Sequence, residues 1–521
     1  MVSKLRNSLK NEKIELICFF AFMIIGIFAR VWQFGIVPGD INQDEAFAGY
    51  EAYSLLHYGM DSSGYHFPVY LTAWGSGMNA LNTYLMIPFI AVFGLEVWVI
   101  RLPQLIVSCF TLWVVYLIVK RVINTKAALL ALLLTAVCPW HIYLSRWGLE
   151  SNLAPGFILF ALYFFIKGTE KPKFLMLSAL FYGLSLYTYA TIWPVVPLMI
   201  LLQLLYCFCY KKIKFTKELL FSGLILAAQA VPLLLFLLVN YGVIEEICTP
   251  VFSVPKLVSM RSGEISLTHI IPNARNLWHI VWDQMKRMPG DFSGKYGLFS
   301  CMTMPFFFIG LFYYGKQIIR NFRKKEFGYE IFIMIQFLAG IILGLLIHVN
   351  VTRVNILFIP VIIITASGMN WIFSLIHYNL IWFIIPFYLI QFVLFEHHYF
   401  TEYRHRISYH FEYGIRDALN EAMSHDGEIW ITDKVKFSNV LFFSKEPVDE
   451  YLGTVKYKNY PDAFLQVESF GRFRFGIDIE TPDTDNIYVL EASEDLTEFY
   501  TNGFTIENYG HFAVAYISEN S

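Results

Sequence analysis

The sequence predicts an α-helical polytopic membrane protein with a small α/β domain at its C-terminal end. Apolar residues make up 56% of the 521 residues and aromatic residues 18%, well above the usage of soluble domains. Eleven apolar stretches approach the roughly 20 residues that a helix needs to cross a bilayer. After residue 400 the pattern changes to short segments of alternating polarity, which is typical of strands.

The membrane-spanning part begins with an anchor. Its first apolar run follows four basic residues, as in a signal peptide, but its length and the lack of a small-residue cleavage site indicate a retained helix. A twelfth apolar stretch, Leu81 to Leu95, contains Pro88 and is short for a span, which favours a juxtamembrane or re-entrant helix. The eleven predicted spans begin near residues 14, 102, 127, 153, 174, 193, 219, 298, 329, 356 and 380.

The distribution of lysine and arginine predicts the orientation of these spans. With the Leu81 stretch left out of the count, the basic clusters within 120–126, 167–173, 211–217 and 316–325 fall on the side of the basic N-terminus. Because cytoplasmic loops carry the excess of basic residues, the N-terminus is expected in the cytoplasm and the C-terminal tail outside. The segments then expected on the outer face are 36–101, 145–152, 242–297 and 350–355.

The tail differs from the rest of the chain in charge and pattern. From residue 400 onward it contains 22 acidic and 10 basic residues, a balance of about -12. We therefore expect a transmembrane catalytic module over 1–399 and an extracytoplasmic α/β domain over 400–521. Helical spacing of apolar residues runs from Phe411 to Met423. The expected strands are EIWIT, VLFFS, FRFGIDI, IYVLEA and FTIENYGHFAVAYI.

Several classes of function are excluded by what the sequence lacks. The predicted cytoplasmic loops are too short for a nucleotide-binding domain, and no glycine-rich phosphate loop follows a predicted strand. No nucleic-acid partner is expected. The seven cysteines fall mostly in apolar runs and none lies in the tail, so they are interpreted as small core residues. Chemistry is therefore expected on the outer face.

An acidic pair lies in the first predicted outer segment, in GDINQDEAFAGYEAYSLL. Asn42 and Glu45 are spaced as a capping box that opens a helix over 43–58, which Gly59 would end. This capping accounts for Glu45 but leaves Asp44 without a structural reason. Asp44, with Glu45 beside it, is therefore a candidate for catalysis.

Arginines on the predicted outer face form a second constellation. Arg146 and Glu150 lie four residues apart in PWHIYLSRWGLESN, so on one helix they would share a face and could pair. The alternative is a phosphate site, because a guanidinium grips phosphate through two parallel hydrogen bonds. Further outer arginines are Arg101, Arg261 and Arg353.

A metal site is the weaker alternative for this region. His57, His66, His141 and His269 could join Asp44 or Glu51 around a divalent ion, but their spacing matches no usual ligand pattern. No obligatory cofactor is identified from the sequence, and a divalent metal stays open.

Four stretches of the chain together resemble the multi-spanning glycosyltransferases of the protein O-mannosyltransferase type, which have the GT-C fold. These stretches are DEAFAGYEAYSLL, VIRLP, PWHIYLSRWGLESNLAPGFILFALYFFIKG and SLYTYATI. The resemblance covers roughly residues 15–370, and the tail resembles the outer domain of bacterial members. It implies a polyprenyl-phosphate sugar donor in the cell membrane. It also implies Asp44 as general base, Glu45 as its neighbour and Arg146 as a contact of the donor phosphate.

We extend these roles by position along the chain. Arg353 and Arg261 are expected to join Arg146 at the donor phosphate, and the residues expected to support the site are Glu150, Glu51, His141 and Arg101. One departure from the family is that WGSGMNAL occupies residues 74–81, where many relatives have a Lys-Pro-Pro run. This difference leaves donor-phosphate contacts or acceptor choice open.

The predicted function is transfer of a monosaccharide from a polyprenyl-phosphate donor to a protein, wall polymer or lipid acceptor. The main alternative is a polytopic transporter or lipid flippase with an outer domain. Transporters tend to bury ionisable residues in mid-membrane, whereas the predicted spans here are nearly free of charge. A receptor whose tail binds ligand is a third alternative, and it would leave Asp44 and Arg146 without a role.

Overall fold

The computed structural model describes all residues except 1, 261–266, 284–294, 478–481 and 519–521. The chain divides into two compact units, each built from segments that are distant in sequence. Unit 1 contains Met1–Phe34, Gln104–Val231 and Ser262–Thr401, and unit 2 contains Gly35–Pro103, Pro232–Arg261 and Glu402–Ser521. The predicted boundary at residue 400 is close to the last of these breaks, while the assignment of a catalytic module to 1–399 stays a prediction.

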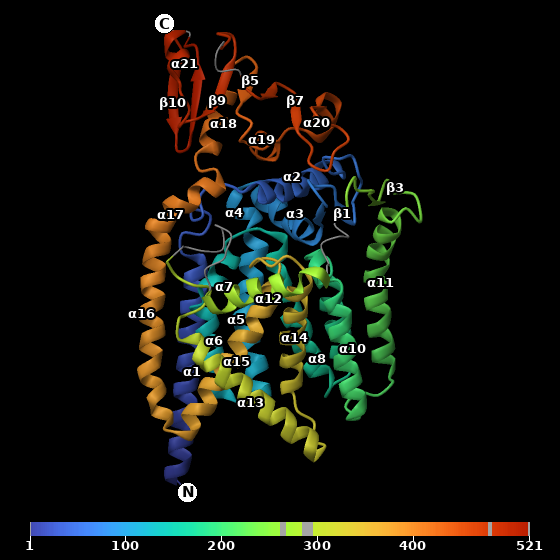
Figure 1. Cartoon of the computed structure of the whole chain (residues 1–521), viewed down its shortest axis with the longest axis vertical. Coiled ribbons are helices and arrows are strands. Elements are labelled where there is room, and N and C mark those ends of the chain that lie inside the picture. The colour runs from blue at the N-terminus through green and yellow to red at the C-terminus, as the bar shows by residue number, and fades with distance from the viewer. Residues whose placement is uncertain (1, 261–266, 284–294, 478–481, 519–521) are drawn as a thin grey trace. The chain divides into compact units, whose positions relative to one another are not determined.

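Unit 1 is a bundle of long apolar helices (Figure 1). Two of the helices named below, α5 and α11, lie mostly in unit 1, and the remainder of each lies in unit 2. Its helices are α1 (Val2–Val31), α5 (Leu102–Val122), α6 (Thr125–Ala136), α7 (Pro139–Ser145), α8 (Ala154–Gly168), α9 (Phe174–Ser185), α10 (Val195–Cys209), α11 (Lys217–Asn240), α12 (Ile270–Trp278), α13 (Thr303–Lys324), α14 (Glu330–Leu346), α15 (Phe358–Leu375) and α16 (Ile381–Phe400).

Each of the eleven predicted stretches forms a helix in unit 1. Within the described part of the chain, seven helical segments are long and apolar enough to cross a membrane, or eight if α6 and α7, bent by 61° at their junction, form one span. The helices α9 and α14 are shorter apolar helices. A multi-pass membrane protein is therefore confirmed, and the number of eleven spans stays a prediction.

Small residues allow close packing inside unit 1. A side chain at Gly310 of α13 would collide with the carbonyl of Ile364 in α15, and one at Gly368 of α15 would collide with the carbonyl of Phe306. In a membrane, apolar side chains gain little by leaving lipid for another helix. Helices there associate through close van der Waals packing of this kind. The pair α13–α15 therefore depends on glycine at both positions.

Unit 2 contains a mixed seven-stranded sheet with strand order β10-β11-β9-β5-β8-β7-β6, in which β5 is parallel to both β8 and β9. Its strands are β5 (Ile429–Ile431), β6 (Lys456–Tyr457), β7 (Val467–Phe470), β8 (Phe473–Phe475), β9 (Ile487–Glu491), β10 (Thr505–Tyr509) and β11 (Phe512–Tyr516). Its helices after residue 400 are α17 (Glu402–Ile407), α18 (Ile415–Ser424), α19 (Phe437–Ser444), α20 (Val448–Thr454) and α21 (Thr497–Thr501).

Most of the strands predicted for the tail are present, but one is wrong. VLFFS lies in the helix α19. A short apolar run buries its side chains equally well as strand or helix, so periodicity alone does not separate the two. The sheet and the helices share a buried core that includes Leu419 of α18, Ile431 of β5 and Val514 of β11.

The first segment predicted to lie on the outer face, residues 36–101, also belongs to unit 2. It forms α2 (Gln43–Tyr58), β1 (Tyr70–Leu71), β2 (Met78–Asn79), α3 (Leu81–Phe93) and α4 (Val97–Ile100), and the segment after α11 adds β3 (Ile247–Thr249) and β4 (Phe252–Val254). The Leu81 stretch is the 13-residue helix α3 with Pro88 inside it. Tyr50 of α2 lies in the same buried core as the sheet, so α2 folds together with the tail.

Candidate functional site

The start of α2 has the predicted capping geometry. The Asp44 N–H donates to Oδ1 of Asn42 at 3.0 Å, and the Asn42 N–H donates to Oε2 of Glu45 at 3.3 Å, within a complete capping box. Gly59 ends the helix with a φ of 70°, in the left-handed region that favours glycine. The predicted helix over 43–58 is therefore confirmed, with both of its end signals.

Glu45 is engaged in a buried ion pair. Its two carboxylate oxygens accept from Nε and Nη2 of Arg101, each at 2.8 Å, and both side chains are fully buried. Arg101 also donates to the carbonyls of Pro38 and Asp40, at 3.0 and 2.9 Å. This two-pronged geometry gives Glu45 and Arg101 a structural role, and a catalytic role for Glu45 stays a prediction.

Asp44 differs from Glu45 in exposure. It lies in the first turn of α2, where the helix dipole favours a negative charge, and its side chain is only partly buried. Of the two adjacent carboxylates, Asp44 is therefore the one that keeps solvent-accessible surface.

Glu51, predicted as a supporting residue, is buried further along α2. Both its carboxylate oxygens accept from Ser62, one from the backbone N–H at 2.8 Å and one from the hydroxyl. Burial and the nearby charge of Asp61 raise the pKa of Glu51, and burial likewise raises the pKa of Asp61. This carboxyl pair therefore holds a proton more strongly than exposed acids do.

In unit 1, Arg146 caps the end of a membrane helix. Its guanidinium donates to the carbonyls of Arg30 at 3.0 Å and Gln33 at 2.8 Å, at the C-terminal end of α1. It also faces the rings of Tyr399 and Phe400, at 5.7 and 5.2 Å from their centroids. Helix C-termini leave carbonyls without an intrahelical partner, and a cation there is favourable.

The interpretation of Arg146 and Glu150 as neighbours on one helical face is wrong. The helix α7 ends at Ser145, with Arg146 as its C-cap residue, and Glu150 opens a separate 3-10 helix over Glu150–Leu153. The chain turns between them, so a spacing of four no longer places them on a shared face. Glu150 itself is buried.

His141 contacts a buried arginine, Arg30, that the sequence analysis did not identify. Arg30 of α1 is fully buried and its Nε and Nη2 lie 3.2 and 2.7 Å from Nδ1 of His141. It also donates to the carbonyls of Gly26, Thr135 and Ala136. The signal was available, because a single arginine inside an apolar run is rare unless it has partners within the bundle.

The described residues give little support to the weaker alternative of a metal site. With Arg30 at its Nδ1, His141 has only one ring nitrogen left for a ligand. Over the ranges that the structure describes, no group of three or more His, Cys, Asp or Glu side chains is arranged to hold an ion.

Arg353 lies in the turn between α14 and α15. Its N–H donates to the side chain of Asn350 at 2.8 Å, and its side chain is partly buried. The side-chain amide of Asn355, two residues after Arg353, donates to the carbonyl of Ser151 at 2.7 Å. The segments 145–152 and 350–355, both predicted to lie on the outer face, are thus adjacent in unit 1, whereas Arg261 lies outside the described residues.

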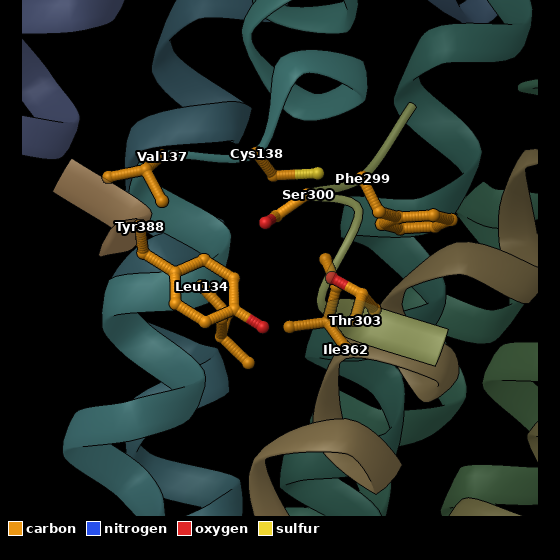
Figure 2. Close-up of a pocket in the computed structure, with 8 residues that line it drawn as sticks. All are labelled: Leu134, Val137, Cys138, Phe299, Ser300, Thr303, Ile362 and Tyr388. Atoms are coloured by element: carbon orange, nitrogen blue, oxygen red, sulfur yellow. The ribbon is translucent and has the colours of Figure 1, made fainter. Parts of the chain in front are cut away.

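Unit 1 also contains a small internal cavity that none of the predicted site residues lines. Figure 2 shows the hydroxyls of Ser300, Thr303 and Tyr388 facing this cavity. The other lining residues are Leu134, Val137, Cys138, Phe299 and Ile362. We therefore do not assign it to the candidate site.

Comparison with known proteins gives one partial family match and several similar folds. Residues 81–236 match the family described as dolichyl-phosphate-mannose-protein mannosyltransferase, and no curated protein sequence matches the chain. The fold is similar to that of ArnT from Cupriavidus metallidurans in the apo state, with a TM-score of 0.56 and 11% identity over 96% of this chain and 97% of that chain. The same enzyme bound to undecaprenyl phosphate gives 0.55 and 12% with the same coverage.

A further similar structure is the oligosaccharyltransferase of Archaeoglobus fulgidus in the apo form, with 14% identity and a TM-score of 0.48 over 83% of this chain. The chain spans 64% of the length of that enzyme.

The chain thus has the fold of ArnT, which is the GT-C fold expected from the sequence. More particularly, its residues 81–236 are similar to the dolichyl-phosphate-mannose-protein mannosyltransferase family, and this match covers less than a third of the chain. The predicted fold class is confirmed, and the family match over residues 81–236 agrees with the resemblance.

Proposed function

We propose that the protein transfers a monosaccharide from a polyprenyl-phosphate donor to an acceptor at the outer face of the membrane. The observation that carries the proposal is the separation of the acidic pair: Glu45 is fully buried against Arg101, while Asp44 beside it keeps accessible surface. The similar enzyme bound to undecaprenyl phosphate supports a lipid-phosphate donor. The acceptor is a protein, a wall polymer or a lipid.

Asp44 is the general base of the proposed reaction. It accepts the proton of the acceptor hydroxyl as that oxygen forms a bond to the anomeric carbon of the sugar. The bond between this carbon and the phosphate oxygen breaks, and its electron pair stays on the polyprenyl phosphate. A carboxylate suits this role because proton transfer within the transition state lowers the barrier.

The departing phosphate gains negative charge, so a nearby cation stabilises the transition state more than the bound donor. Arg353, whose side chain is partly accessible, is the first candidate for this contact, with Arg261 as a further member. Arg146 belongs to the predicted clamp as well, and its bonds to the α1 carbonyls support an additional role in holding the segment that follows α7.

The proposed reaction is extracytoplasmic. The excess of lysine and arginine on the opposite side supports a cytoplasmic N-terminus and an extracytoplasmic C-terminal domain. Nucleotide sugars are confined to the cytoplasm, so a sugar carried on a lipid phosphate is the activated donor that can reach this face.

The proposal is tested with purified protein in vesicles that contain undecaprenyl phosphate carrying radiolabelled mannose, glucose or galactose in separate arms. The acceptor is envelope material from a strain that lacks the gene. Transfer of label from the lipid to the acceptor in one arm, and none from labelled nucleotide sugars, is expected. Transfer from nucleotide sugars alone, or from neither source, would overturn the proposal.

A further inference from the structure

The loop before α2, residues 37–42, is bound to the first residues of the C-terminal domain. Oδ2 of Asp40 accepts from the N–H of Gly414 at 2.5 Å, and Nδ2 of Asn42 donates to the carbonyl of His410 at 3.3 Å. These partners are more than 360 residues apart in sequence, yet both bonds lie within unit 2. The backbone that leads into Asp44 is therefore held by residues of the C-terminal domain, His410 and Gly414.

Arg101 connects three parts of unit 2. Its guanidinium holds Glu45 of α2 and the carbonyl of Asp40 in the loop, and it lies over the ring of Phe411 at 5.4 Å from the centroid. Cation–π contacts of a desolvated arginine are the stronger ones. One buried side chain thus connects the loop, α2 and the segment 408–414.

The segment 408–414 is itself fixed to the sheet. The carbonyl of Tyr413 accepts from the N–H of His511, between β10 and β11, at 3.0 Å. The hydroxyl of Ser408 lies 2.7 Å from Nε2 of the same histidine. Gly414 has a φ of 97°, and a side chain there would collide with the carbonyl of Tyr509. The bonds to Asp40 and Asn42 therefore come from a rigid support.

The body of α2 is held by the same domain. A Cβ at Gly49 would lie 2.7 Å from the ring of Phe442 in α19, and the Tyr50 hydroxyl donates to the carbonyl of Glu446 at 2.7 Å. Such close packing leaves α2 little freedom to shift or rotate. Both the helix and the loop that precedes it depend on the C-terminal domain for their place.

We propose that the C-terminal domain positions the Asp44 carboxylate for catalysis, with Asp40 as the main positioning residue through its bond to Gly414. This inference rests on the proposed function, in which Asp44 is the general base. Asp40 does not touch the substrate, and it acts by holding the backbone four residues before Asp44. Displacement of a catalytic group by about 1 Å can cost as much as about a hundredfold in rate.

The test compares Asp40→Ala, Asp40→Asn and Asp40→Ser with wild type, and Asp433→Ala serves as a control at an exposed aspartate of the same domain. We expect Asp40→Ala to lower kcat by about tenfold to a hundredfold, with the KM for the lipid-linked donor nearly unchanged. Asp40→Asn keeps an oxygen that accepts from Gly414, so it should restore most of kcat. Hydrogen exchange of residues 38–46 should accelerate in Asp40→Ala and in Asp40→Ser, and it should stay at the wild-type rate in Asp40→Asn and Asp433→Ala.

Unchanged kcat in Asp40→Ala would overturn the inference, and so would a loss of kcat without faster exchange in residues 38–46. If Asp40→Ala does not fold, Asp40→Ser is judged by the same criteria. The proposed function fails separately: full turnover by Asp44→Asn refutes the base, whereas an inactive Asp44→Asn with a fully active Asp40→Ala refutes only the positioning role.

Discussion

Arg101 and Glu45 form an ion pair in which both side chains are fully buried and two hydrogen bonds of 2.8 Å run in parallel. The pair connects the end of α4 to the first turn of α2, 56 residues earlier in the chain. Because Glu45 is occupied in this way, the two adjacent carboxylates of the acidic pair lie in different environments, with Glu45 buried and Asp44 partly accessible.

We expect Glu45→Gln to destabilise the protein strongly, because it leaves the Arg101 charge buried without its partner. Breaking a buried pair in this way costs about 3–5 kcal/mol. The measurement is unfolding of the purified protein in detergent. Glu491→Gln, which removes one of the two acidic partners of the exposed Lys434, should cost less than about 1 kcal/mol. Equal effects of the two substitutions would contradict the structural role of Glu45.

The sequence was sufficient for local features and insufficient for distant pairs. The capping box of Asn42 and Glu45 follows from a spacing of three residues, so the helix and its ends were predictable. The partner of Glu45 was not, because no local rule connects it to Arg101. The bond between Asp40 and Gly414 was hidden for the same reason.

Apolar patterns were informative about spans and less so about the tail. Each predicted span is a helix, since only a helix satisfies its own backbone within lipid. In the tail, both helix and strand can bury an apolar run, and the residues around Leu441 form a helix where a strand was expected. Arg146 was recognised as unusual on the outer side, but its bonds to the end of α1 depend on how the helices pack.

Arg353 and Arg146 should respond differently to substitution. Arg353→Ala is expected to raise the KM for the lipid-linked donor at least about tenfold, while Arg353→Lys keeps the charge and partial activity. Arg146→Ala should also lower the melting temperature, because it leaves the carbonyls of Arg30 and Gln33 without their donor. Unchanged donor affinity in Arg353→Ala would remove it from the phosphate site.

The proposed orientation predicts which cysteines can be labelled from outside. In a variant without the native cysteines, a cysteine at Ser493 in the C-terminal domain should react with a membrane-impermeant thiol reagent in intact cells. A cysteine at Thr216, between α10 and α11, should react only after the membrane is opened. Labelling of Thr216→Cys in intact cells would reverse the orientation of this loop and indicate that α3 crosses the membrane.

Stability should depend on pH through Glu412. Burial raises its pKa to about 8, against a usual value of 4.5, and Asn439 donates to its carboxyl group. Since the folded-state pKa lies above the unfolded one, the contribution of Glu412 to stability is complete below about pH 4.5 and is lost as the pH rises through about 8.

Glu412→Gln mimics the protonated form, so its melting temperature should fall less than that of wild type between pH 6 and about pH 9. Glu468→Gln, at an exposed position of the same domain, is the control and should follow the wild-type curve. Parallel curves for Glu412→Gln and wild type would show that Glu412 does not titrate in this range.

The most direct test of the central claim is sugar transfer by Asp44→Asn, measured with undecaprenyl phosphate that carries the radiolabelled sugar accepted by the wild type. Asparagine keeps the size of the side chain and cannot take up the acceptor proton. The account predicts a fall in kcat of about 10²- to 10⁴-fold, with an unchanged melting temperature and unchanged donor binding. Turnover close to that of wild type by a folded Asp44→Asn protein would contradict it.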